Sequence, residues 1–234
     1  MTARLEIWPV EGIPEIRPGD DLAGAIAAAE PGLADGDVVV VTQKVVSKAE
    51  GKLEPIDPDD PRGHKPIVER ESVRILRRRG ELIIAETRHG FVCANAGVDL
   101  SNVDEGWAAL LPDDPDRSAR RIRDGLRARL GVEVAIIVSD TFGRVWRRGL
   151  TDVAIGCAGI RAVVDLRGTA DSRGRELLVT EVCVVDELAG AAEMVMGKAT
   201  GVAAAVVRGV DPSWLGRGEV RGEVVRHPTE DLFR

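Results

Sequence analysis

Residues 134–159 read VAIIVSDTFGRVWRRGLTDVAIGCAG and say most about the fold class. The first five residues, 134–138, are apolar and mostly β-branched, which predicts a strand covered on both faces of a sheet. We expect this strand to stop at Ser139. The carboxylate of Asp140 and the hydroxyl of Thr141 then lie at its C-terminal edge, where open α/β sheets bind ligands.

Three arginines follow a turn that we expect at Gly143: Arg144, Arg147 and Arg148. Carboxylate, hydroxyl and guanidinium groups together suit a metal-bound substrate that carries phosphate. A strand end followed by a solvated arginine turn is the alternative interpretation. This segment alone leaves both open.

Length and composition set bounds on the class of protein. The 234 residues can bury a substantial core, as one large domain or two small ones, and the formal net charge of -7 argues against a nucleic-acid binder. No apolar run approaches the ~18 residues of a membrane span, and a signal peptide is absent, so we expect no membrane partner and a cytoplasmic protein. The three cysteines lack CxxC spacing, which argues against zinc and disulfides and favours structural roles.

Predicted strands and helices alternate along the chain. This order predicts an α/β (α+β) fold with mixed sheets and flanking helices. Strands are expected at residues 5–8, 38–42, 82–85, 91–94, 134–138, 153–155, 162–166 and 203–208. Helices are expected at residues 20–30, 68–79, 117–130 and 180–196. The last is expected to have Thr180 as its N-cap and one apolar stripe made by Val182, Val185, Ala189, Ala192 and Met196.

A second polar group follows the predicted strand at 91–94, in the segment FVCANAGVDLSNV. Asp99 and Asn102 lie there on a tight loop, and an Asx-capped turn is the alternative interpretation. Because Asp140 also follows a strand, the carboxylates of Asp99 and Asp140 could converge across a sheet edge. Hard oxygen ligands of this kind suit magnesium or manganese.

A third polar group follows the predicted strand at 38–42. Lys44, Lys48 and Lys52 recur every four residues, in a chain with only five lysines. A lysine close to a strand end is a natural point charge for phosphate, and a solvated basic face is the alternative. The later segment at 197–200, GKAT, is no Walker A loop, because Ala199 follows Lys198. With no GxGxxG after a strand either, the chain lacks both the P-loop and the Rossmann fingerprint.

Five segments, spread over most of the chain, closely resemble one family. They are GIPEIRPGDDL (12–22), DGDVVVVTQKVVSKAEGKL (35–53), AGVDLSNV (96–103), VSDTFGRVWRRGLTDVAIGCAGI (138–160) and ELLVTEVCVVDELAGAAEMVMGKATG (176–201). The family is that of the coenzyme F420-0:L-glutamate ligases, GTP-dependent γ-glutamyl ligases of deazaflavin cofactor biosynthesis. The chain is especially similar to the ligase domain of the actinobacterial form, so residues 1–234 are expected to be one γ-glutamyl ligase domain. It is either a stand-alone ligase or the N-terminal half of a two-domain protein whose flavin-binding reductase half is absent from this chain, and the sequence leaves this choice open.

The resemblance implies roles for individual residues. The family's metal carboxylates match Asp99 and Asp140, and a ligand of a second metal ion matches Thr141. The family often has Ser where this chain has Gln43. The nucleotide contacts match Ile13, Pro14, Glu15, Ile16, Thr42, Gln43, Lys48, Asn102 and a late segment at 193–200 that includes Glu193 and Lys198. Expected cofactors are Mg²⁺ or Mn²⁺, with up to two ions per site, and K⁺.

The family's fold resembles an intertwined homodimer of two interwoven lobes, so one lobe alone is expected to lack a complete site. The apolar strands at 38–41 and 134–138, which need cover on both faces, also favour a twin subunit. The implied reaction joins L-glutamate to coenzyme F420-0 through an acyl phosphate made from GTP, and can continue to longer tails. In it Lys48 would neutralise phosphate, and Arg144, Arg147 and Arg148 would bind the anionic substrate.

Two other classes of function stay open at this point. One is a different metal-dependent phosphoryl or nucleotidyl transferase on the same scaffold, and the other is a non-catalytic nucleotide-binding module. The sequence leaves open the number of glutamates added and the choice between magnesium and manganese.

Overall fold

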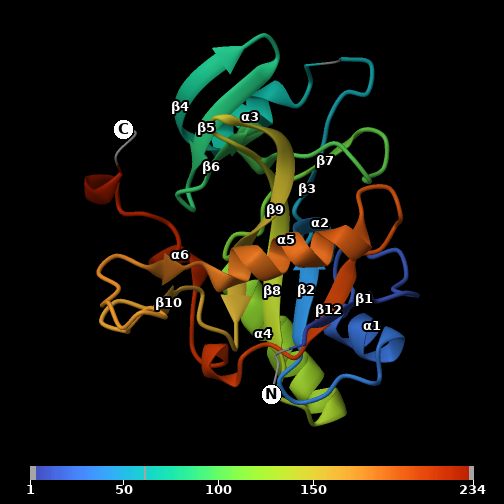
Figure 1. The fold of residues 1–234 in the computed structure, drawn as a ribbon. Coiled ribbons are helices and arrows are strands. Elements are labelled where there is room, and N and C mark those ends of the chain that lie inside the picture. The colour runs from blue at the N-terminus through green and yellow to red at the C-terminus, as the bar shows by residue number, and fades with distance from the viewer. Residues whose placement is uncertain (1–3, 61, 232–234) are drawn as a thin grey trace.

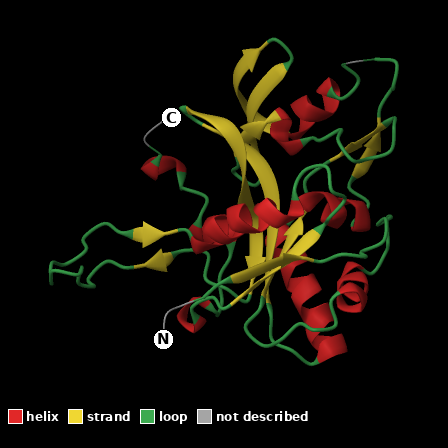
Figure 2. Ribbon diagram, turned by 45° about the vertical axis from the view of Figure 1, so that its right-hand side comes forward, coloured by secondary structure: helices red, strands yellow, loops and turns green. Residues whose placement is uncertain are grey.

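The computed structural model describes residues 4–60 and 62–231. This part of the chain contains six α-helices and twelve strands. The strands form one sheet of five strands and three smaller sheets (Figures 1 and 2). The prediction of a mixed α/β fold is therefore confirmed. None of the helices in these residues is long and apolar enough to cross a membrane.

The five-stranded sheet forms the centre of the molecule. Its strands lie in the order β1-β12-β2-β8-β9, with β2 and β8 parallel and every other pair antiparallel. The strands are β1 (Glu6–Pro9), β12 (Ala204–Arg208), β2 (Val38–Thr42), β8 (Ala135–Arg144) and β9 (Arg147–Ala158). The four valines of β2 are 0% exposed, because a continuous β-branched run fits a strand covered on both faces.

Helices from the same chain cover both faces of this sheet. Helix α5 (Val184–Met196) crosses one face, and α4 (Pro115–Leu130) packs on the other with α1 (Leu22–Ala29) beside it (Figures 1 and 2). Asp114 caps α4 by accepting a hydrogen bond from the Arg117 amide. Because β2 and β8 are already covered here, their burial gives no argument for a twin subunit.

A smaller lobe has its own apolar core around Val68, Ile83 and Ala85. It combines α3 (Lys65–Glu71) with the sheet β4 (Ser72–Arg79), β5 (Leu82–Thr87) and β6 (Val92–Ala94). The helix predicted for 68–79 is wrong after Glu71. The chain turns back at Gly80, whose φ of 57° suits a tight hairpin turn, and β4 pairs with β5.

The helix predicted for 180–196 begins later than expected. Glu181–Val182 forms β11, which pairs with β10 (Val164–Asp165), and the helix starts at Val184 with Cys183 in the N-cap position. Thr180 is no cap, because its carbonyl oxygen accepts the Leu166 amide beside the β10–β11 pair. Val185, Ala189, Ala192 and Met196 form a buried stripe on α5, as predicted, whereas Val182 lies in β11, whose strand pairing was not predicted.

The prediction that the strand at 134–138 stops at Ser139 is also wrong. Strand β8 continues to Arg144, and the turn lies at residues 145–146 instead of Gly143. The extension pairs only with β9, because β2 ends at Thr42, opposite Ser139. Asp140 therefore lies inside a strand, at the point where the central sheet becomes a two-stranded hairpin.

The remaining elements are short. Helix α2 (Gln43–Ala49) follows β2 directly. Strands β3 (Leu53–Pro55) and β7 (Trp107–Ala109) pair with each other, and α6 (Val220–Glu223) lies near the end of the described chain.

Candidate active site

The register of the central sheet brings separate parts of the sequence to one edge. Thr42, the last residue of β2, lies opposite Ser139 of β8. The Thr42 amide also donates to the Ala203 carbonyl (2.9 Å), and the Val10 amide donates to the Ala204 carbonyl (2.8 Å). These contacts gather the segment before β12 and the loop after β1 at the edge where β2 ends. The predicted segments at 13–16, 42–48, 140–141 and 193–200 therefore adjoin this edge.

Three carboxylates, those of Asp99, Asp140 and Asp152, lie near enough to one another beside this edge for their charges to interact. Burial raises the pKa of Asp140 to about 7, the Thr141 amide (2.8 Å) opposes that rise, and the negative charges of Asp99 and Asp152 add to it. Asp99 comes from the loop after β6, and its backbone pairs with Ala109. The structure thus brings Asp99 and Asp140 near each other, as predicted, although Asp140 lies within β8 and not after it. Their role as metal ligands stays a prediction.

The loop that carries Asp99 is tied to neighbouring elements. Burial alone would raise the pKa of Asp99, but the Ser101 amide and the Lys44 ammonium outweigh burial, so its pKa is lowered. Lys44 Nζ lies 3.0 Å from Asp99 Oδ2 and donates to Ser101 Oγ at 2.8 Å. Asn102, with a φ of 53°, donates from Nδ2 to the Lys198 carbonyl at 3.5 Å. Two predicted nucleotide contacts, Asn102 and Lys198, are therefore neighbours.

Lys48 and Glu15 form an ion pair across the same edge. The Lys48 side chain is 12% exposed and the Glu15 side chain 70%, so the ammonium is held between α2 and the loop after β1. Ile16 is buried and anchors that loop, Ile13 is half-buried and Pro14 is exposed. Two residues predicted to contact the same nucleotide are thus in direct contact.

Gln43 is turned away from the edge. It is 1% exposed, and its Nε2 donates to the Leu110 carbonyl (3.0 Å) and to Ser47 Oγ (2.5 Å). These bonds commit the side-chain amide to the interior, so the structure gives no support to a nucleotide contact through the Gln43 side chain. Thr42 beside it is half-buried.

The late segment reaches the carboxylates through Lys198. Its Nζ lies 3.5 Å from Asp152 Oδ1 and 4.0 Å from Glu193 Oε1. The pKa of Glu193 is raised by burial and by the charge of Asp152, against the opposing charge of Lys198. Glu193, on the last turn of α5, therefore belongs to the same cluster.

The predicted arginines do not join this cluster within one chain. Arg144 and Arg147 close the β8–β9 hairpin, and Arg144 Nη2 donates to the Arg148 carbonyl at 3.1 Å. All three are exposed. Arg144 is four strand residues beyond Asp140, about 13 Å along the hairpin. Contact with a substrate at Asp140 requires a long substrate or a second subunit, so their role stays a prediction.

Comparison with known proteins decides the family. A model of the F420-0:Gamma-glutamyl ligase family matches residues 12–209. The chain belongs to the F420-0:gamma-glutamyl ligase family. Relatives named coenzyme F420:L-glutamate ligase occur in Methanopyrus kandleri (43% identical, 100% of this chain and 98% of the relative) and Methanothermobacter thermautotrophicus (47%, 96% and 97%). A third, from Archaeoglobus fulgidus, is 40% identical over 99% of this chain and 97% of its own length. The predicted family and the prediction of a ligase enzyme are confirmed.

The donor atoms of this ligase fit a hard divalent cation. Asp99, Asp140 and Thr141 offer only oxygen, which magnesium and manganese prefer. Burial raises the pKa of the nearby Cys93 thiol to about 12, so it stays a thiol and a poor ligand. Across residues 4–60 and 62–231, no three His, Cys, Asp or Glu side chains are already arranged as a ligand set. Asp99 is instead held by Lys44, and the Thr141 hydroxyl by Asp152.

Two contacts of the predicted metal ligands could not be read from the sequence: that of Asp152 with Thr141 and that of Lys44 with Asp99. Nothing local marks Asp152, a single carboxylate in the apolar strand sequence TDVAIGCA, as different from an edge residue. The signal that could have found it is the hairpin register, which sets Asp152 opposite Thr141. Lys44 was noted as part of a lysine series, but its partner lies 55 positions away in the sequence.

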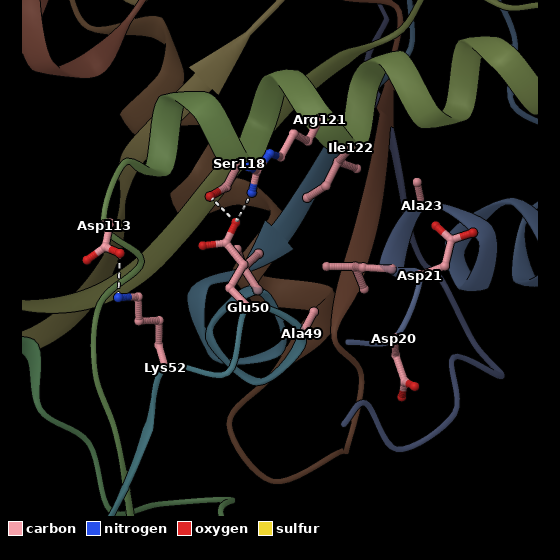
Figure 3. A pocket seen from close by; sticks show the side chains of 12 residues that line it. Asp20, Asp21, Ala23, Ala49, Glu50, Lys52, Asp113, Ser118, Arg121 and Ile122 are labelled. Atoms are coloured by element: carbon pink, nitrogen blue, oxygen red, sulfur yellow. Dashed lines mark hydrogen bonds and ion pairs between the residues drawn. The ribbon is translucent and has the colours of Figure 1, made fainter. Parts of the chain in front are cut away.

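Two cavities among the described residues lie away from these carboxylates. Figure 3 shows one of about 390 Å³ between α1, α2 and α4, where Glu50 meets Ser118 and Arg121, and Lys52 meets Asp113. Its lining contains none of the predicted site residues. Each of the three lysines has a different acidic partner: Asp99 for Lys44, Glu15 for Lys48 and Asp113 for Lys52. Lys52 also lies beyond the end of α2, so the three lysines do not form one helical face. A larger cavity of about 990 Å³ lies beside Val134, at the opposite end of β8.

Proposed function

We propose that this protein joins L-glutamate to coenzyme F420-0, at the expense of GTP, with Mg²⁺ or Mn²⁺ in the site and K⁺ as a further ion. One observation carries the proposal. Within a chain of this family, the sheet register gathers the predicted nucleotide segments around Asp99 and Asp140. The relatives are named coenzyme F420:L-glutamate ligase, which supports F420 and L-glutamate as substrates.

The chemistry must activate a carboxylate, because joining a carboxylate to an amine in water is uphill. A carboxylate oxygen of F420-0 attacks the γ-phosphorus of GTP, the bond to the bridging oxygen breaks and GDP leaves. The glutamate amine then attacks the acyl carbon of the resulting acyl phosphate, loses a proton, and inorganic phosphate departs. Phosphoryl transfer asks the protein mainly for positioning and charge neutralisation.

The residues at the sheet edge suit these tasks. Asp99, Asp140 and Thr141 would hold the divalent ion, which neutralises phosphate charge when bound. Lys48, now paired with Glu15, supplies an ammonium to the phosphates. The thiols of Cys93 and Cys183 take no part, because desolvation raises the pKa of both to about 12 and keeps them protonated.

We also propose that the ligase works as a homodimer. The tip of the β8–β9 hairpin exposes Val145 (70%), Trp146 (88%) and Leu150 (67%) beside the three arginines. Large exposed apolar side chains on a projecting hairpin favour contact with another chain. A second subunit is also the means by which Arg144, Arg147 and Arg148 could approach an anionic substrate.

The function is tested by product mass. Incubation with F420-0, GTP and L-glutamate should add one glutamate minus water per step, with magnesium or manganese required. Asp140→Asn should abolish the product, whereas Asp113→Asn, an exposed carboxylate outside the cluster, should retain it. A nucleotidyl or phosphoryl adduct of F420-0 without added glutamate would replace this proposal with the transferase alternative.

A further inference from the structure

Asp152 is a buried carboxylate that no predicted role explains. Its side chain is 2% exposed, and it lies on β9 directly opposite Thr141 of β8. Thr141 Oγ1 donates to Asp152 Oδ1, and Ser139 Oγ donates to Asp152 Oδ2 at 2.9 Å. Burying a charge without partners is costly, so these bonds are what holds the carboxylate in this position.

The direction of the Thr141 hydroxyl proton follows from this contact. An ionised carboxylate only accepts hydrogen bonds, so the proton between Thr141 Oγ1 and Asp152 Oδ1 belongs to the threonine. The lone pairs of Oγ1 are then left for another partner. A hydroxyl binds a cation through these lone pairs, and a hydroxyl whose proton pointed outward would oppose it.

The charge of Asp152 is only partly neutralised. Its nearest ammonium, Lys198 Nζ, is 3.5 Å away on a side chain that is 61% exposed. Solvent screens such an exposed ammonium. The negative charge of Asp152 therefore also acts on the neighbouring carboxylate of Asp140.

We infer that Asp152 is a positioning residue for a divalent cation: it orients the Thr141 hydroxyl with its lone pairs toward the ion. This inference rests on the proposed function, because it takes Thr141 as a ligand. Carboxylates that hold a ligand in this way are worth about 10–100-fold in metal affinity. A purely structural Asp152 would instead serve only to satisfy two buried hydroxyls.

The experiment measures Mn²⁺ affinity of the full chain with GTP present, from the loss of the free-ion EPR signal. Asp152→Asn should weaken binding by about 10–100-fold, because the anionic acceptor is lost. Ser139→Ala is the matched control, since it removes the other hydrogen bond of the same carboxylate and leaves Thr141 in place. It should bind Mn²⁺ within about threefold of the unaltered protein.

A double-mutant cycle with Thr141→Val separates positioning from direct ligation. If Asp152 acts through Thr141, the double variant should bind Mn²⁺ no more weakly than the weaker single variant. Losses that multiply would overturn the inference, as would an Asp152→Asn affinity within threefold of the unaltered protein. Thermal unfolding checks that each variant folds. If Asp152→Asn does not fold, Asp152→Ser takes its place, with the same expected loss of Mn²⁺ affinity.

The Mn²⁺ measurement distinguishes failure of the proposed metal site from failure of the role inferred for Asp152. If the unaltered protein binds no Mn²⁺ with GTP, the metal site in the proposed function fails and this inference fails with it. If the unaltered protein and Asp152→Asn bind equally well, only the role of Asp152 fails.

Discussion

Replacing Asp140 by asparagine should make the metal-free protein more stable at alkaline pH. In the folded chain, burial raises the pKa of Asp140 from 3.8 to about 7. The Thr141 amide opposes this rise, and the charges of Asp99 and Asp152 add to it. Between these values the folded state holds a proton that the unfolded state has lost, so stability falls as pH rises. This contribution of Asp140 is full below pH ~4 and lost above pH ~7. The asparagine variant does not lose it.

The size of the effect follows from the same values. A pKa raised from 3.8 to about 7 corresponds to about 4 kcal/mol. For a chain of this length, 1 kcal/mol moves the melting temperature by about 2–4 °C, which gives roughly 8–16 °C. Because Asp140 keeps some contact with solvent, we expect a smaller difference of several degrees. Excess Mn²⁺ with GTP should reverse the order, since only the unaltered protein gains from a full ligand set.

The assay is differential scanning fluorimetry with EDTA at a series of pH values from 5 to 8.5. Asp113→Asn is the control. Lys52 lowers the pKa of Asp113, with burial opposing it, so removing this carboxylate should give no gain in stability at alkaline pH. An Asp140→Asn melting temperature that tracks the unaltered protein across the series would refute the buried-cluster argument.

Three further outcomes are expected. Lys48→Ala should raise the GTP concentration needed for half-maximal rate without changing the product. Lys52→Ala should leave that concentration unchanged, because the Lys52 ammonium pairs with Asp113 away from the sheet edge. Equal effects of the two changes would refute the assignment of Lys48. Light scattering should give twice the 25.1 kDa of one chain, and a fully active monomer would contradict the proposed dimer. Cys93→Ala should keep the rate of glutamate addition within about twofold, because burial raises the pKa of this thiol and keeps it protonated, and loss of product by a folded variant would assign it a chemical role.

The core of the fold could be predicted because its signal is local. The run of four valines in β2 and the apolar stripe of α5 each determine their own burial, and both lie where expected. The surface strand β4 could not be predicted, because almost all of its side chains are exposed and its state depends on pairing with β5. The same applies to the extension of β8 past Ser139, which exists because β9 pairs with it.

The positions of the main site residues could be predicted from the sequence, but most of their contacts could not. Asp99 and Asp140 each follow or end an apolar run, so their approach to one sheet edge could be inferred from topology. The partners that hold them could not: Lys44 meets Asp99 across 55 positions, and Asp152 meets Thr141 only through the hairpin register. The internal bonds of Gln43 likewise depend on Leu110, 67 positions away.

The central claim is carboxylate activation by GTP, and oxygen transfer tests it most directly. F420-0 labelled with ¹⁸O in its terminal carboxylate is incubated with GTP, L-glutamate and Mg²⁺, and the released phosphate and the product are analysed by mass spectrometry. Activation through an acyl phosphate predicts one labelled oxygen in phosphate for each first glutamate added, and no rapid phosphate release without F420-0. Glutamylated product with unlabelled phosphate would contradict the acyl phosphate, and full-rate GTP hydrolysis without product would contradict the proposed ligation.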